Sequence, residues 1–112
     1  MAKWSNNKTD QNSGQAPIAY TFSSPVPYEL VSVRVHLSAA GGTAENFTID
    51  VDSDAGTKYN VRMFTHDMEE VQDLFWSPDK DISCESGDRL VFTYANTNTR
   101  NFGLEIVYRQ AI

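Results

Sequence analysis

The sequence of 112 residues lacks several features that mark whole classes of protein. It has one cysteine, Cys84, so neither an intrachain disulfide nor a metal site made of several cysteines can form. No apolar run reaches the length of a membrane-spanning helix, and the first residues lack the apolar stretch of a secretory signal peptide. We therefore expect a single domain in a cytosol-like compartment, away from membranes and stabilised by its own hydrophobic core.

Positive charge is also scarce. The chain has 9 Lys and Arg residues against 15 Asp and Glu residues, which gives a net charge of −6 and a pI near 4.7. Binding nucleic acid through its phosphates needs a basic face. We therefore expect no direct nucleic-acid partner, and the acidic balance indicates little beyond good solubility.

Catalytic and metal-binding patterns are absent as well. The two histidines, His36 and His66, are far apart in the sequence, and no G-x-S-x-G or H-E-x-x-H motif occurs. The segment Asp50–Gly56 begins like a calcium-binding loop, but its glycine falls one place late and Val61 stands where such a loop has glutamate. The sequence therefore predicts a protein that is not an enzyme and has no catalytic residue, metal site or cofactor.

What the sequence does contain is short runs in which apolar and polar residues alternate, the period of half-buried β-strands. In the run 28–37 we expect Val31, Val33, Val35 and Leu37 to share the buried face, and in the run 71–77 we expect apolar groups to be covered on both faces. The spacing of the runs predicts an all-β protein, a single jelly-roll-like β-sandwich of seven or eight antiparallel strands. The expected strands are 18–23, 28–37, 46–52, 58–64, 71–77, 82–84, 89–94 and 102–109.

The clearest alternation lies near the C-terminus. The runs 89–94 and 102–109 flank a polar turn, which is typical of a β-hairpin. We expect this core hairpin to have a firmly held register, because a slip of one residue would expose every core side chain. The expected core-facing pairs are Leu90–Ile106, Phe92–Leu104 and Tyr94–Phe102.

A second hairpin is expected between residues 46–52 and 58–64. One register places three apolar pairs on the core face and two polar pairs on the outer face, where opposite charges across a ladder support it modestly. The expected pairs are Phe47–Met63, Ile49–Val61 and Val51–Tyr59 on the core face, and Thr48–Arg62 and Asp52–Lys58 on the outer face.

The N-terminal residues 1–16 are almost entirely polar and cannot build a core. We expect them to form an extended arm, disordered when alone, that precedes a sandwich domain at residues 17–112. Trp4 is the exception in this arm. It is either an idle residue in a flexible tail or an anchor that docks on a neighbouring subunit, since large aromatic residues dominate interface energetics.

Aromatic residues leave a binding alternative open. Jelly-roll modules often bind sugars with exposed tryptophan and tyrosine rings, and the candidates here are Trp4, Trp76, Tyr28 and Tyr59. The competing interpretation places Tyr59 and Trp76 in the core, because their strands require apolar residues at those positions.

The segment 85–94, with Gly87-Asp88 followed by Leu90 and Tyr94, resembles the penultimate hairpin of many jelly-roll domains. Together with 96–100 and 102–108 it is similar to small virion structural proteins of tailed bacteriophages, and the resemblance covers residues 17–112. It implies a capsid decoration (cement) protein, or another small accessory protein of the particle. Such a protein would bind the major capsid protein or other virion proteins and also its own copies, as a dimer or trimer. It implies a location in the virion, and in the host cytoplasm during assembly.

No functional residue is carried over by this resemblance, because such proteins act through surface contacts. The alternative function is a carbohydrate- or receptor-binding module of a virion or tail, and a third is an accessory domain of a hydrolase.

Overall fold

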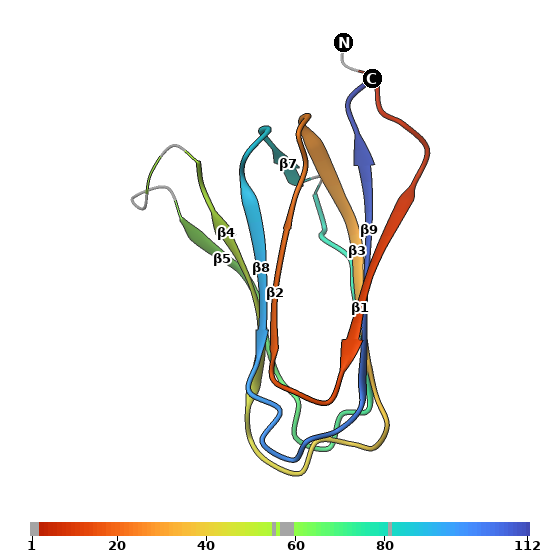
Figure 1. Ribbon diagram of the computed structural model, residues 1–112, viewed down its shortest axis with the longest axis vertical. Helices are drawn as coiled ribbons and strands as arrows, with labels where there is room; N and C mark the ends of the chain where they lie inside the picture. The colour runs from red at the N-terminus through yellow and green to blue at the C-terminus, as the bar shows by residue number, and fades with distance from the viewer. Residues whose placement is uncertain (1–2, 55, 57–59, 81) are drawn as a thin grey trace.

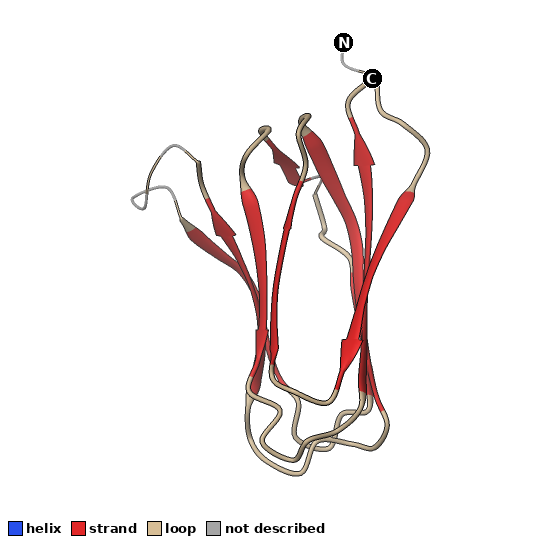
Figure 2. Cartoon of the chain, in the orientation of Figure 1, coloured by secondary structure: helices blue, strands red, loops and turns tan. Residues whose placement is uncertain are grey.

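The computed structural model describes residues 3–54, 56, 60–80 and 82–112. These residues form strands and no helix, so none of them belongs to a helix that could span a membrane. The strands build two facing antiparallel sheets, and the two chain termini lie together at one end (Figures 1 and 2). In chain order they are β1 (Lys8–Gly14), β2 (Ile18–Ser23), β3 (Tyr28–Leu37), β4 (Asn46–Asp52), β5 (Val61–Asp67), β6 (Asp73–Trp76), β7 (Ile82–Cys84), β8 (Arg89–Tyr94) and β9 (Phe102–Gln110).

The strand order identifies the architecture. The five-stranded sheet runs β1-β9-β3-β6 with β7 also paired to β3, and the four-stranded sheet runs β2-β8-β4-β5. Consecutive strands change sheet at the β1–β2, β2–β3, β3–β4, β5–β6, β7–β8 and β8–β9 connections. This is the eight-stranded jelly roll with β7 as a short additional strand. The predicted all-β, jelly-roll-like sandwich is confirmed.

The predicted C-terminal hairpin is wrong in its pairing. β8 pairs with β2 and β4, whereas β9 pairs with β1 and β3, so the two strands lie in opposite sheets and face each other across the core. Alternation indicates which side of a strand is buried but not which sheet the strand joins, and the loop 95–101 is long enough to cross between sheets. The six predicted side chains are nevertheless all buried: Leu90, Phe92, Tyr94, Phe102, Leu104 and Ile106.

The second hairpin exists, but in another register. β4 pairs with β5 so that Phe47 lies opposite His66 and Ile49 opposite Phe64. The register then shifts between Ile49 and Asp50, which leaves Met63 as the extra residue of a bulge on β5. The outer-face pair is therefore Asp50–Arg62 instead of the predicted Thr48–Arg62, and the pairs predicted with Lys58 and Tyr59 lie outside the described residues.

A second bulge changes the buried face of β3. The register between β3 and β9 shifts between Leu30 and Ser32. As a result Tyr28 and Leu30 join Val33 in the core, whereas Val31, predicted to face inward, is only half-buried. A bulge inserts one residue, so it reverses the side to which the preceding part of the strand points.

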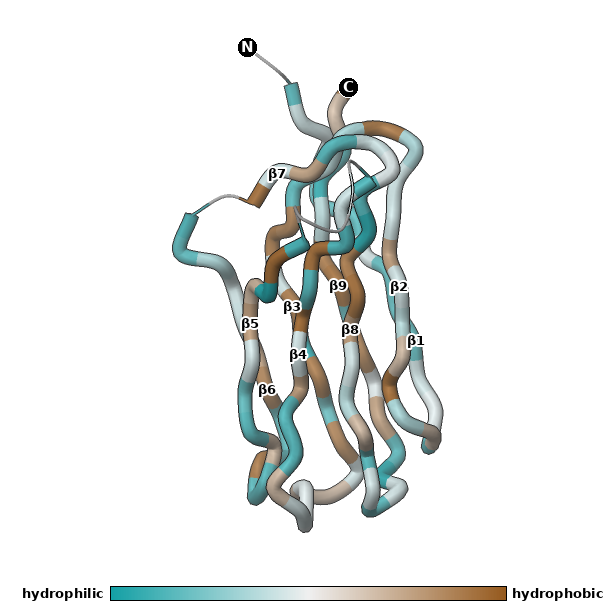
Figure 3. Tube along the Cα trace, turned by 90° about the vertical axis from the view of Figure 1, so that its left-hand side faces the viewer, coloured by the Kyte–Doolittle hydropathy of each residue, from teal (hydrophilic) through white to brown (hydrophobic). Residues whose placement is uncertain are grey.

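The hydrophobic core fills the space between the sheets. Figure 3 shows hydrophobic residues along β3, β4, β8 and β9, the inner strands of the two sheets. Phe47 and Phe92 stack there with their ring centroids 6.4 Å apart. The buried apolar residues are Ile18, Phe22, Tyr28, Leu30, Val33, Val35, Leu37, Phe47, Ile49, Met68, Cys84, Leu90, Phe92, Tyr94, Phe102, Leu104 and Ile106.

The N-terminal segment differs from the expected free arm. Residues 8–14 form β1, which pairs with β9 along its whole length at the edge of the five-stranded sheet. Its core-side residues Asp10 and Asn12, opposite Ile106 and Leu104, are polar and half-buried. The strand therefore depends on backbone pairing and polar contacts, which is why hydrophobic alternation did not reveal it. That residues 17–112 form a domain without it stays a prediction.

A buried side chain joins two of the loops at the end opposite the termini. Asn96 has a φ of 50° and is 2% exposed. Its amide nitrogen reaches the carbonyl oxygens of Gln15, Ala16 and Arg100 at 3.1, 3.1 and 2.9 Å, and its amide oxygen accepts from the Arg100 backbone N–H at 3.0 Å. Asn96 thus fixes the β1–β2 connection to the loop between β8 and β9.

Candidate functional site

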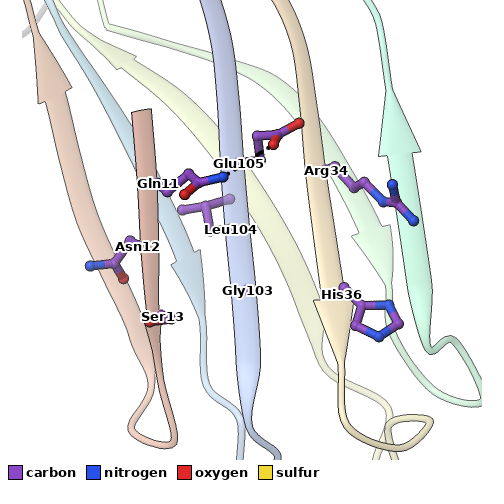
Figure 4. A pocket seen from close by; sticks show the side chains of 8 residues that line it. All are labelled: Gln11, Asn12, Ser13, Arg34, His36, Gly103, Leu104 and Glu105. Carbon is purple, nitrogen blue, oxygen red and sulfur yellow. Dashed lines mark hydrogen bonds between the residues drawn. The ribbon is translucent and has the colours of Figure 1, made fainter. Parts of the chain in front are cut away.

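A shallow hollow lies on the outer face of the five-stranded sheet, over β1, β9 and β3 (Figure 4). Its volume is about 670 Å³. A Cβ atom added to Gly103 would meet no atom within 4 Å, so the missing side chain leaves open space on the central strand. The hollow is lined by Gln11, Asn12, Ser13, Arg34, His36, Gly103, Leu104 and Glu105.

Strand register brings these residues together from distant parts of the chain. Glu105 on β9 lies opposite Gln11 on one side and Arg34 on the other. Gly103 lies in the same way between Ser13 and His36. Directly opposite residues point to the same face of a sheet, so two rows of polar side chains cross the outer face, with the glycine as a gap in one row.

The charged side chains of this face are already paired. Arg34 donates to both carboxylate oxygens of Asp73 on β6, from Nε at 3.1 Å and from Nη2 at 2.7 Å. These hydrogen bonds lower the pKa of Asp73 and raise the pKa of Arg34. His36 Nδ1 lies 3.9 Å from Asp73 Oδ1, and Gln11 Nε2 donates to Glu105 at 3.3 Å. The polar groups are therefore oriented before any partner arrives.

An exposed aromatic ring extends the same face. Phe75 lies directly opposite Arg34 and is 67% exposed. The prediction that the run 71–77 is covered on both faces is wrong at this position. The neighbouring Trp76 points to the other side of β6 and stacks on Phe64 with ring centroids 4.8 Å apart. The sequence does not distinguish Phe75 from a buried residue, because apolar Leu74 and Trp76 flank it and the whole run was expected to be covered on both faces.

The aromatic residues proposed from the sequence lie elsewhere. Tyr28 is buried and donates its hydroxyl proton to the Asp88 carbonyl oxygen at 2.7 Å, and Trp76 packs against the core, so both sit in the fold itself. Trp4 is half-buried and forms an isolated bridge with Ala111 at the C-terminus. Tyr59 lies outside the described residues.

Two of the three aspartates that resembled a calcium loop have arginine partners. Asp50 accepts from Arg62 Nε at 2.8 Å, and Asp52 accepts from Arg89 Nε at 3.0 Å. In the described ranges, no cluster of three or more His, Cys, Asp and Glu side chains is placed to hold a metal ion.

The polar hollow with its adjacent aromatic ring is thus the candidate functional site. No protein-family model matches the chain, and no curated protein matches it by sequence. A solved structure is similar, namely a chain in the acidic stable capsid structure of Helicobacter pylori bacteriophage KHP30. The two chains are 17% identical with a TM-score of 0.65, and the match covers 100% of this chain and 97% of that chain. This likeness shows that the two chains share a fold over nearly their whole length.

Proposed function

We propose that the protein is a non-enzymatic structural component of a virion, and specifically a capsid decoration (cement) protein. The observation that carries the proposal is the match in fold, from end to end, to a chain of a bacteriophage capsid structure. In this role it binds the major capsid protein or other virion proteins, together with its own copies. Its locations are the virion and, during assembly, the host cytoplasm.

Because one fold can serve many functions, the proposal also needs a surface suited to binding. The outer face of the five-stranded sheet supports it. An aromatic ring and an arginine, Phe75 and Arg34, lie side by side there, and these are residue types enriched at interfaces. Polar groups surround them, as in the rim of a docking site. We assign this face to contact with the shell, and Trp4 to an anchoring contact with a neighbouring subunit.

Purified particles test this function. Quantitative mass spectrometry is expected to find the chain in high copy number, and purified protein is expected to bind particles that lack it. Phe75→Ser should weaken that binding, because it removes the exposed ring without touching the core. Val61→Ser is the matched control, since Val61 is 57% exposed on β5 of the other sheet. Absence of the chain from particles would overturn the proposal.

A carbohydrate- or receptor-binding module of a virion or tail is the second candidate function. The hollow favours it, because guanidinium, imidazole, carboxylate and amide groups surround a gap beside an exposed ring. Low copy number in particles would support this role, as would saccharide-dependent amide shifts confined to Gln11, Arg34 and Gly103 in a heteronuclear NMR titration. High copy number without such shifts would contradict it.

A further inference from the structure

The outer edge of β1 is a long, regular strand edge that no described strand covers. Among the described strands β1 stands at the end of its sheet and pairs with β9 alone, so alternate backbone N–H and C=O groups point away from the molecule. Natural proteins commonly block such edges with proline, a bulge, inward charges or a very short strand. β1 has seven residues in unbroken register and no proline. Its charged residues are Lys8 at the first position and Asp10, whose carboxylate points to the core side and accepts a hydrogen bond from Tyr20.

The other edges in the described part of the chain are less open to pairing. β6 has four residues and β7 has three. β5 carries the bulge at Met63 and the long side chain of Arg62, and β2 lies between Pro17 and Pro25. β1 is therefore the longest regular edge that can accept another strand.

We propose that two copies of the protein pair antiparallel through β1, which forms a two-fold dimer with one continuous sheet. This dimer would supply the contact between copies that the proposed virion function includes, and in that respect it rests on that function. The occupant is a second copy of this chain because β1 is complementary to itself in one register.

The symmetry and the charges select that register. In a two-fold antiparallel pair the residues directly opposite each other share a face, so the axis must pass beside a single residue and its copy. An axis at Asp10 would place two carboxylates opposite each other, which is unfavourable. An axis at Asn12 would leave Lys8 and Thr9 without a partner in the second β1. An axis at Gln11 pairs the whole strand.

The Gln11 register also matches side-chain chemistry. It places Asp10 of each copy opposite Asn12 of the other, so an amide N–H can donate to a carboxylate. Within each copy, Asp10 is already held by a hydrogen bond from Tyr20, and Gln11 is already held by its hydrogen bond to Glu105. Ordering before association lowers the entropy lost on pairing.

The area of a single polar strand pair is small, so the isolated dimer is expected to be weak and to gain strength where many copies are held on one surface.

Cysteine cross-linking of the full-length chain tests the register. Gln11→Cys places two sulfur-bearing residues across the axis with Cα atoms about 4.5–5.5 Å apart, which suits a disulfide. Thr9→Cys is the matched control on the same face, because its two copies are about 14 Å apart in this register. Cys84 is buried in both variants. We expect mild oxidation to link Gln11→Cys about tenfold faster than Thr9→Cys, and equal rates, or no link in either, would overturn the register.

Sedimentation equilibrium tests the dimer without oxidation. Gln11→Lys places two like charges opposite each other in the dimer, whereas within each copy the new lysine can pair with Glu105. We expect the dimer dissociation constant at low salt to rise about two- to fivefold, with no change for Thr9→Lys. A wild-type monomer at millimolar concentration would overturn the inference. If such a monomer still binds particles, the proposed function survives without this dimer.

Discussion

The phenol of Tyr20 on β2 donates a hydrogen bond to the carboxylate of Asp10 on β1. This contact joins the two sheets at the side of the sandwich where both edge strands lie (Figure 1). The hydrogen bond, followed by burial, raises the pKa of Tyr20 from 10.0 to about 12. The polar edge strand is thereby tied to the opposite sheet by one of its own side chains.

Alkaline pH should break the hydrogen bond between Tyr20 and Asp10. The pKa of Tyr20 is higher in the folded state than in the unfolded state, so its stabilising contribution is complete below pH 10 and is lost as pH rises through 12. Tyr20→Phe should cost about 1 kcal/mol at neutral pH and should make stability less sensitive to pH between 10 and 12. Urea unfolding at a series of pH values measures both effects. Coincident curves for the two proteins would show that the contact contributes nothing to stability.

Asn96 should be intolerant of substitution. Asn96→Ala removes buried hydrogen bonds that hold the β1–β2 connection, and it leaves a residue other than Asn or Gly at a φ of 50°. We expect a loss of about 2–3 kcal/mol in the free energy of unfolding. Asn98→Ala is the control in the same loop, because Asn98 is only half-buried and accepts one bond, from the Gly42 N–H. Equal losses for both variants would contradict this role.

The positions of most strands could be predicted, because they depend on residues that are close together in the sequence. Strands 18–23, 28–37 and 46–52 have the predicted bounds, because alternation and the turn residues around each run determine both the strand and its ends. β1 was not predicted, because it is polar on both faces and is held in the sheet by its backbone pairing with β9.

Pairing and the candidate site depend on non-local register, which alternation does not contain. The bulges at Val31 and Met63 each add a residue without a sequence signal that distinguishes them from their neighbours. The hollow requires Gly103 to lie between Ser13 and His36, and these positions are joined only once the jelly roll is formed. The outward direction of Arg34 and His36 was predictable, but their partners were not.

The ion pair between Glu29 and Arg109 gives a third prediction. The Glu29 side chain is 5% exposed and the Arg109 side chain is 36% exposed. Arg109→Met leaves a buried carboxylate without its cation, so we expect a loss of about 3 kcal/mol. The double variant with Glu29→Gln should recover part of this loss, since the neutral amide needs no counter-charge. A double-mutant cycle from urea midpoints measures the coupling, and strict additivity would contradict it.

The N-terminal segment has a structural role and a proposed interface role, and a truncation and a point substitution can separate the two. Deletion of residues 1–16 removes β1 but no apolar side chain of the core, so residues 17–112 are expected to remain a folded β-sandwich by circular dichroism. The truncated protein should be less stable, since it loses the ladder with β9 and the tie to Tyr20. Its exposed β9 edge should also increase non-specific association. A truncated protein that is unfolded would show that β1 is indispensable to the domain.

Trp4→Ala separates the anchor from the strand. Residues near Trp4 are already held by the C-terminus, since Ser5 N–H donates to the Gln110 carbonyl oxygen at 2.8 Å and Ile112 N–H donates to the Lys3 carbonyl oxygen at 3.0 Å. Backbone bonds of this kind survive the substitution, so we expect an unchanged melting temperature. If Trp4 anchors a neighbouring subunit, particle binding at equal protein concentration should fall by tenfold or more, the effect of losing about 1.4 kcal/mol or more at an interface. A lower melting temperature with unchanged particle binding would instead place the ring in the fold of its own chain.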